Sequence, residues 1–313
     1  MLLWYAYFNF MDLKQIAGRF GLDVSRFDPV RHAVLSDVFI CDEKYVLRSR
    51  TLETGVFERF KNEQNLLGEI RRIVPVKFPE LLKTETGDNF ITEQESLWTA
   101  YPFIPGEILC AWWNLEKLSE EKSKNTFLTL RELHENTRGK LVRIDIRNEY
   151  HFLDDVRERL ADSGSEITER ERARVKKAIE IVNRFEQNLQ ERDFCFVHGD
   201  YHPGNVIFNG DKIIGLLDTD WSRKGHCLED LAYTLMMFLR NYQQQQFHFD
   251  FENYSKFLGW YGIQESDIPM FREYFILYTF YDTHLFRDLE QLPNRDRVFE
   301  FQKRFLEDAC QRF

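Results

Sequence analysis

The chain has 313 residues with a formal net charge of −10, and 15% of its residues are aromatic and 30% charged. This composition is typical of a folded globular protein, and the length suffices for one large domain or two lobes with a substantial core. The negative charge argues against a nucleic-acid partner, because contacts to phosphate backbones need a surplus of Lys and Arg, and more weakly against an anionic membrane surface.

The cysteines indicate a reducing compartment. They are odd in number and widely separated, and no Cys-x-x-Cys occurs, so we expect neither a disulfide framework nor a structural zinc site. They stand at Cys41, Cys110, Cys195, Cys227 and Cys310. We therefore expect a cytoplasmic protein.

The opening segment, Met1 to Phe10, is apolar but lacks the basic region and the small-residue cleavage site of a signal peptide. It is too short to span a bilayer, and no later stretch is long enough and free enough of charge to do so. Two interpretations stay open for it. Either the segment packs on the first lobe, or Met11 is the natural start.

Residues 1–102 predict a lobe that mixes helix and strand, with a helical extension over residues 1–25. Apolar residues recur at helical spacing from Leu13 to Phe20, and Gly21 is the predicted stop. A second amphipathic helix is predicted over Phe57–Ile70. The predicted strands are Val30–Leu35, Val38–Cys41, Tyr45–Arg48 and the hairpin of Phe90–Thr92 with Leu97–Tyr101.

A cluster of Pro102, Pro105 and Gly106 interrupts this pattern and is the best candidate for a linker between lobes. Residues 103–313 then predict a larger, mostly helical lobe. Its expected helices cover Phe127–His134, Val156–Leu189 with a polar break at Asp162–Ser165, and the region from Leu228 to the end. Two short apolar runs, Phe194–Val197 and Ile213–Leu217, flank the candidate catalytic residues. The layout predicts an α+β fold with a small sheet-containing N-lobe and a larger helical C-lobe.

Between the two apolar runs lies His198-Gly199-Asp200-Tyr201-His202-Pro203-Gly204-Asn205. Asp200 and Asn205 have the spacing of the protein-kinase catalytic loop, H-R-D-x-x-x-x-N, with Gly199 in place of the arginine. Phosphoryl transfer needs a carboxylate that accepts the proton of the attacking hydroxyl, and oxygen ligands for magnesium. We predict Asp200 as the base and Asn205 as a Mg²⁺ ligand. His198 is expected to orient the loop, and His202 to pack or form hydrogen bonds.

The second apolar run ends in Asp218-Thr219-Asp220. A carboxylate at the end of a buried strand is held rigidly, and magnesium prefers such oxygen ligands. Asp218 is therefore predicted as the second Mg²⁺ ligand.

Two other chemistries share parts of these motifs. An apolar strand ending in Asp-x-Asp resembles the nucleophile motif of haloacid-dehalogenase phosphatases, but no alternating βα units follow it here. Gly199–His202 resembles a metallophosphoesterase motif, which needs an Asp-x-His upstream. The Asp-x-His of this chain, Asp282–His284, lies downstream. Both alternatives fit poorly.

Three segments together resemble the aminoglycoside phosphotransferase and choline kinase family: Val197–Phe208, Gly215–Trp221 and Glu229–Ala232. The resemblance is strong over about residues 125–240. It implies a bilobal protein-kinase-like fold and the transfer of a phosphate from ATP or GTP, with Mg²⁺, to a hydroxyl. In that family the last Asp-Leu-Ala closes a contact at a helix start behind the active site, so Asp230 is expected to be structural.

The first lobe departs from the kinase pattern. Arg48 stands where kinases carry a phosphate-binding lysine, and strand alternation directs it to the same face as Val46. Glu63 on the following helix is its expected ion-pair partner, unless both are surface residues. No glycine-rich loop joins the first two strands, so Ser36 or backbone amides would approach the phosphates. The resemblance implies that the backbone of Tyr101 to Phe103 binds the purine.

The substrate is expected above Asp200, against Asp220, Trp221 and the C-terminal helices. There Asp282 forms either an acidic wall or part of a solvated helix face. The negative charge is compatible with a cationic substrate, although a solvated acidic surface explains it as well. Family members act on aminoglycosides, choline, homoserine, methylthioribose and sugars, so the resemblance identifies neither the acceptor nor the choice of ATP or GTP.

We expect a small-molecule hydroxyl substrate, no nucleic-acid or membrane partner, and a monomer or homodimer. The rival interpretation is a degenerate kinase-like protein that binds a nucleotide or a partner without turnover. The missing glycine-rich loop favours this rival, whereas the presence of Asp200, Asn205 and Asp218 together opposes it.

Overall fold

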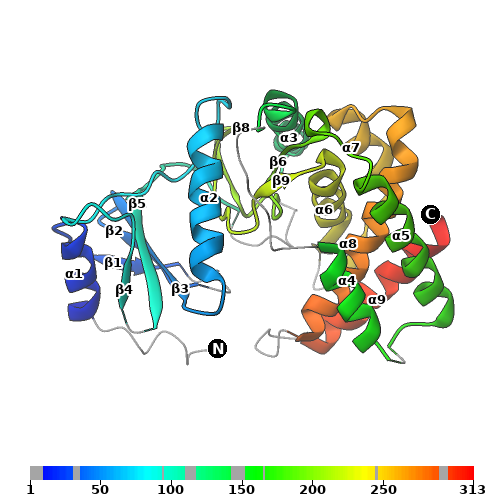
Figure 1. Ribbon diagram of the computed structural model, residues 1–313, viewed down its shortest axis with the longest axis horizontal. Helices are drawn as coiled ribbons and strands as arrows, with labels where there is room; N and C mark the ends of the chain where they lie inside the picture. The colour runs from blue at the N-terminus through cyan, green and yellow to red at the C-terminus, as the bar shows by residue number, and fades with distance from the viewer. Residues whose placement is uncertain are drawn as a thin grey trace.

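The computed structural model describes residues 10–30, 36–93, 95–109, 118–141, 152–164, 166–243, 246–288 and 295–313. These residues form two lobes, a smaller one built on a sheet and a larger one that is mostly helical (Figure 1). The predicted α+β, bilobal architecture is confirmed.

The elements follow one another along the chain without an internal repeat. The helices are α1 Phe10–Arg19, α2 Val56–Ile70, α3 Glu120–Thr137, α4 Phe152–Asp162, α5 Glu169–Glu186, α6 Cys227–Leu239, α7 Tyr254–Tyr261, α8 Ile268–Asp288 and α9 Arg295–Arg312. The strands are β1 Phe27–Pro29, β2 Val38–Cys41, β3 Tyr45–Thr51, β4 Ile91–Glu93, β5 Ser96–Pro102, β6 Cys195–Val197, β7 Val206–Asn209, β8 Lys212–Leu216, β9 Arg223–Gly225, β10 Arg240–Gln243 and β11 Gln246–Phe249.

The small lobe is built on an antiparallel sheet of five strands in the order β1-β2-β3-β5-β4. The first strand differs from the prediction: β1 lies at Phe27–Pro29, and residues 31–35 lie outside the described residues. The central strand β3 places Leu47 in a core shared with Trp98 and α1. Because successive side chains of a strand point to opposite faces, Arg48 and Arg50 share the other face of β3.

Helix α2 borders the sheet on the side of the large lobe (Figure 1). Val56, Phe60, Leu67 and Ile70 are buried at the spacing of one helical face. Glu63 is buried on the same face at 5% exposure. A buried carboxylate needs a partner, and the face carrying the two arginines of β3 provides it.

The hairpin of β7 and β8 is hydrogen-bonded both to the small lobe, at Lys77, and to the chain just after the predicted linker, at Glu107. On one side Lys77 exchanges backbone hydrogen bonds with Ile214 and Leu216, and on the other Glu107 exchanges two with Phe208, each 2.8 Å long. Gly106 is required here, because a Cβ atom would lie 2.8 Å from the carbonyl oxygen of Phe208. The hairpin is thus attached to both lobes. The predicted lobe division at residue 102 stays a prediction.

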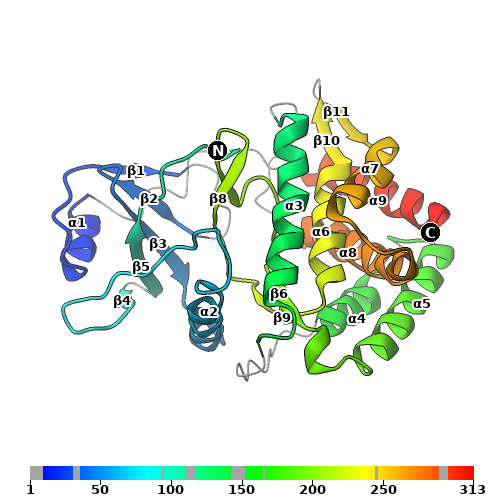
Figure 2. The same cartoon turned by 90° about the horizontal axis from the view of Figure 1, so that it is seen from above.

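The large lobe surrounds α6, which packs on α8 (Figure 2). The two apolar runs that flank the catalytic candidate both contain strands: Phe194–Val197 contains β6, which pairs with β9, and Ile213–Leu217 contains most of β8, which pairs with β7. One prediction is wrong here. The region after Leu228 is not helical throughout, because the β10–β11 hairpin interrupts it. Among the described helices, none combines the length and apolar character that crossing a membrane requires.

Candidate active site

The loop from His198 to Asn205 connects β6 to β7 and takes a left-handed backbone conformation at Gly199. Gly199 has a φ of +81°, and an added Cβ atom would lie 2.4 Å from the carbonyl oxygen of Trp221. The guanidinium of Arg223 is also close, at 2.9 Å from that position. A side chain at this position would therefore meet both strain and a backbone clash, which explains why glycine replaces the arginine of the protein-kinase loop.

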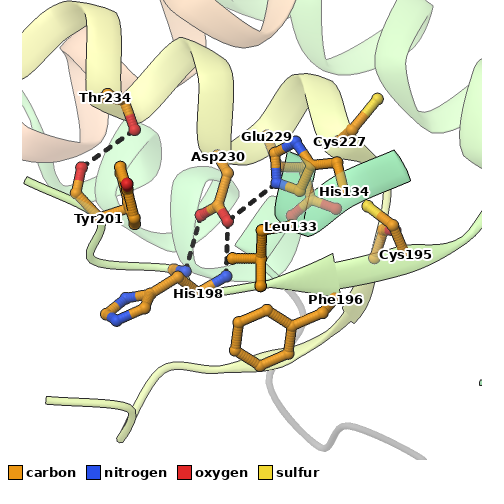
Figure 3. A network of polar contacts seen from close by, with 12 residues as sticks. Leu133, His134, Cys195, Phe196, His198, Tyr201, Cys227, Glu229, Asp230 and Thr234 are labelled. Atoms are coloured by element: carbon orange, nitrogen blue, oxygen red, sulfur yellow. Dashed lines mark hydrogen bonds and ion pairs between the residues drawn. The ribbon is translucent and has the colours of Figure 1, made fainter. Parts of the chain in front are cut away.

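Asp230, in the first turn of α6, holds the start of the loop (Figure 3). Its carboxylate accepts the backbone N–H groups of His198 at 2.5 Å and of Gly199 at 2.7 Å, and it lies 3.3 Å from Nε2 of His134. Burial raises the pKa of Asp230, but its bond to His134 and the nearby His198 outweigh burial and lower it. This geometry supports the predicted structural role of Asp230.

Asp200, the predicted base, is held at both carboxylate oxygens. Asn205 donates to Oδ2 at 2.7 Å, and the phenol of Tyr233 donates to Oδ1. Nε2 of His202 lies 3.5 Å from Oδ1. Burial raises the pKa of Asp200, but His202 and the hydroxyl of Tyr233 outweigh burial and hold the pKa below its usual value. The lowered pKa keeps the carboxylate ionised at neutral pH. The side chain is 23% exposed, so the carboxylate is also accessible.

The two predicted metal ligands lie at the open end of the β7–β8 hairpin, Asn205 just before β7 and Asp218 shortly after β8. The side-chain amide nitrogen of Asn205 donates to Asp200, and among the described residues no donor is bound to its amide oxygen, which can therefore face a cation. The N–H of Leu217 donates to the backbone oxygen of Asn205 at 2.8 Å and brings Asp218 beside it. Asp218 has a φ of +54°, a conformation that is uncommon outside glycine and concentrates at functional sites.

This donor set fits Mg²⁺ at a phosphate-transfer site. Among the described residues, no three His, Cys, Asp or Glu side chains gather as a dedicated metal cage would. Magnesium at such sites is instead bound through one or two carboxylates together with substrate phosphates. The carboxylate of Asp218 and the amide oxygen of Asn205 meet that requirement.

A cluster of two arginines and three carboxylates lies where β3 and α2 meet the residues after β8. Arg48 binds Asp218 at 2.8 Å and Asp220 at 2.9 Å, and its Nε donates to Ser36 at 3.2 Å. Ser36 thus lies beside Arg48, the predicted phosphate-binding residue. Its hydroxyl accepts a hydrogen bond from that arginine.

Glu63 pairs with Arg50, not with Arg48 as predicted. Its carboxylate lies 2.8 Å from the guanidinium of Arg50 and also accepts the hydroxyl of Thr219 at 2.5 Å. Arg50 also binds Asp220 at 2.6 Å. Arg48 and Arg50 share one face of β3, and Arg50 is the one that lies within reach of Glu63. The two arginines thus share Asp220, while Asp218 pairs with Arg48 and Glu63 pairs with Arg50.

The other predicted nucleotide-binding and substrate-binding residues lie in different surroundings. Tyr101 lies opposite Val46 in the sheet, but the N–H of Phe103 donates to the oxygen of Lys44 at 2.8 Å and is already engaged. Asp220 belongs to the arginine cluster described above. Trp221 is half-buried beside Gly199.

Both interpretations of Asp282 are wrong. It is 4% exposed and pairs with the buried Arg240, so it is neither an acidic wall nor part of a solvated helix face. Its carboxylate needs Arg240 because burial raises its pKa.

Sequence reasoning missed Arg50 and Tyr233. Arg50 follows Arg48 by two residues, so the strand alternation applied to Arg48 identifies Arg50 as well. Tyr233 follows Asp230 by three residues on a predicted helix, and residues at that spacing lie on neighbouring positions of one face. The partner of each residue comes from a distant part of the chain.

Two lobes, with the loop of Asp200 and Asn205 close to Asp218 and to the buried arginines of the sheet lobe, are the layout that the resemblance to kinase-like phosphotransferases implied. A family model described as the phosphotransferase enzyme family matches residues 27–261, and the chain belongs to that family. The resemblance seen in the motifs is confirmed. A search of curated protein sequences found no match to the chain.

Solved structures share the fold along nearly the whole chain. A GDP and kanamycin complex of APH(2")-IIia has a TM-score of 0.69 at 15% identity, covering 97% of this chain and 99% of that one. ADP-bound aminoglycoside phosphotransferase APH(2'')-Ib has 0.59 at 17%, covering 97% of each. Apo macrolide 2'-phosphotransferase MphH from Brachybacterium faecium has 0.58 at 17%, covering 95% and 96%. At these identities the likeness shows a shared protein-kinase-like fold.

Proposed function

We propose that the protein transfers the terminal phosphate of ATP or GTP to a hydroxyl group of an amino-alcohol, aminoglycoside or sugar-like small molecule. The observation that carries this proposal is the carboxylate of Asp200, which is ionised, partly exposed and held at both oxygens beside Asn205. The names of the solved structures, which mention ADP, GDP, kanamycin and a macrolide phosphotransferase, support the nucleotide and the acceptor class.

In the proposed reaction the acceptor hydroxyl donates a hydrogen bond to Asp200. Asp200 takes the proton as the hydroxyl oxygen bonds to the γ-phosphorus, and the bond from that phosphorus to the bridging oxygen breaks, so that the nucleoside diphosphate leaves. Arg48 leaves its carboxylate partners and stabilises the phosphates. Asn205 and Asp218 would hold Mg²⁺, which supplies neutralisation of the phosphate charge.

Two variants test the roles of the carboxylates. Asp200→Asn keeps the shape of the side chain but cannot accept the proton, so we expect kcat to fall by about a hundredfold or more with nucleotide affinity nearly unchanged. Asp218→Ala should instead abolish metal-dependent nucleotide binding. Release of ADP or GDP is measured across a panel of amino alcohols, sugars and aminoglycosides, and nucleotide binding is measured by calorimetry.

The outcomes separate the candidate functions. Equal and mild effects of Asp200→Asn and Asp218→Ala would contradict the assigned roles. If the wild-type protein binds nucleotide with Mg²⁺ but phosphorylates no member of the panel, the non-catalytic interpretation replaces this proposal.

A further inference from the structure

We propose that Tyr233 is a positioning residue for Asp200: its hydroxyl occupies one carboxylate oxygen and so directs the acceptor hydroxyl to the other. The proposal rests on the proposed function of Asp200 as the base. It gives a role to a side chain that none of the sequence motifs includes.

Tyr233 is placed by the helix that also holds the loop backbone. All residues of α6 are described, and all except Tyr233 are buried. Asp230, three residues earlier, binds the backbone of His198 and Gly199 (Figure 3). One helix thus fixes the start of the loop through Asp230 and the carboxylate of Asp200 through Tyr233. The packed helix therefore holds both the backbone at the start of the loop and the carboxylate of Asp200 in fixed orientations.

The donors around Asp200 are distributed unequally between its two oxygens. Oδ1 receives the hydroxyl of Tyr233 and faces Nε2 of His202 at 3.5 Å, whereas Oδ2 receives Asn205 at 2.7 Å. The N–H of Gly204 donates to Nδ1 of His202 at 3.0 Å, so Nδ1 is an acceptor and the N–H of the ring is on Nε2, toward Asp200. Each carboxylate oxygen has about two lone-pair sites, and the described residues place two donors at Oδ1 but only one at Oδ2, so the site open to an acceptor is on Oδ2.

The vacant site on Oδ2 lies on the side of Asn205, the proposed metal ligand. An acceptor hydroxyl bound there is held next to the proposed metal and phosphates. A hydroxyl bound to Oδ1 would have to displace Tyr233. The arrangement therefore selects one of two approaches to the same carboxylate, which is the kind of orientation that brings reacting atoms into line.

Tyr233 is suited to remain a donor. Burial is the main cause that raises the pKa of its phenol well above the ordinary value, and the charge of Asp200 adds to it. The phenol therefore keeps its proton at neutral pH. Its ring lies edge-on to that of Tyr278, with centroids 5.8 Å apart, which limits rotation. The buried pair of Arg240 and Asp282 also acts on the phenol, with opposite signs.

The experiment compares Tyr233→Phe with a matched control. Tyr274→Phe also removes one phenol donor to a carboxylate, because Tyr274 donates to Glu186 at 2.8 Å, but it leaves Asp200 untouched. We expect Tyr233→Phe to lower kcat about tenfold to a hundredfold with the acceptor KM unchanged. The acidic limb of kcat/KM should move to higher pH, because the ionised form of Asp200 loses a donor. Tyr274→Phe should change neither kcat nor the limb.

Two kinetic outcomes would overturn the proposal. A lower acceptor KM with undiminished kcat would mean that the phenol occupies the place of the acceptor. Equal losses of activity and of melting temperature in both variants, with no movement of the acidic limb, would mean that Tyr233 only packs.

A readout without turnover separates this proposal from the proposed function. If the wild-type protein phosphorylates no acceptor, the function fails, but the contact can still be tested by ¹³C NMR of the aspartate carboxyls at pH 7. The Asp200 resonance is assigned by its loss in Asp200→Asn. It should shift in Tyr233→Phe and stay in place in Tyr274→Phe. An unchanged shift in Tyr233→Phe overturns the proposal.

Discussion

The guanidinium of Arg48 lies 2.8 Å from a carboxylate oxygen of Asp218, so the residue proposed for phosphates and the residue proposed for Mg²⁺ neutralise each other across the two lobes. The side chain of Arg48 is only 10% exposed. Asp218 is 41% exposed, so the cost of separating the pair falls mainly on the guanidinium, which loses a partner in a buried position. A metal ion can bind Asp218 only when Arg48 releases it, and phosphates can bind Arg48 only when Asp218 releases it. The metal ion and the nucleotide are therefore expected to bind together.

Binding of metal without nucleotide tests this coupling. We expect Mn²⁺, a spectroscopic substitute for Mg²⁺, to bind the wild-type protein weakly in the absence of nucleotide. Arg48→Met should bind Mn²⁺ alone at least about fivefold more tightly, because Asp218 loses its competing cation. The same variant should bind nucleotide more weakly. Electron paramagnetic resonance titration measures free and bound Mn²⁺.

A surface arginine supplies the control for this titration. Arg26 pairs with Asp28 at a side-chain exposure of 66%, and Arg26→Met should leave Mn²⁺ affinity unchanged. Equal Mn²⁺ affinities for the wild-type protein and Arg48→Met would show that the ion pair does not compete with the metal.

Alanine substitutions at Gly199 and Gly210 distinguish the cost of backbone strain from the cost of a steric clash. Both have positive φ, +81° and +59°, but an added Cβ meets the oxygen of Trp221 at 2.4 Å only at Gly199. At Gly210 no described atom lies within 4 Å of it. Gly210→Ala should therefore cost only the left-handed conformation, about 1–2 kcal/mol of unfolding free energy. Gly199→Ala should cost more and also lower kcat, because it displaces the loop from Asp230.

Urea denaturation and initial rates check this pair of variants. Similar losses of stability in the two, with full activity in Gly199→Ala, would show that the loop adjusts to the added methyl group.

The parts of the site that were predictable from the sequence are those whose partners are close along the chain. Asp200 and Asn205 are five residues apart in one loop, so their spacing alone indicates their contact, and α6 shows its apolar character directly. β9 was not predictable, because Arg-Lys-Gly has no strand preference and forms a strand only by pairing with β6.

The failures concern contacts between distant elements. Strand alternation shows that Arg48 and Arg50 share a face, but only the position of α2 decides which of them meets Glu63. Asp282 was misjudged for a similar reason. A carboxylate on a helix normally indicates a solvated face, but α8 is buried around Asp282, and Arg240 from β10 provides the compensating charge.

Glu186, the last residue of α5, is expected to make stability depend on pH. Burial, with the charge of Glu229 as the second cause, raises the pKa of Glu186 from 4.5 to about 7. The folded state therefore holds the proton more tightly than the unfolded state. Its contribution to the unfolding free energy is fully present below pH 4.5 and is lost as the pH rises through about 7, by about 3 kcal/mol at most.

Glu186→Gln should remove that pH dependence. The amide is neutral at every pH and its oxygen still accepts the hydroxyl of Tyr274. The variant should thus be more stable than the wild-type protein at pH 8 and similar to it at pH 5, as measured by urea denaturation at both. Glu180→Gln, at an exposed position of the same helix, should follow the wild-type curve. If Glu186→Gln loses as much stability as the wild-type protein between pH 5 and pH 8, a different group carries the dependence.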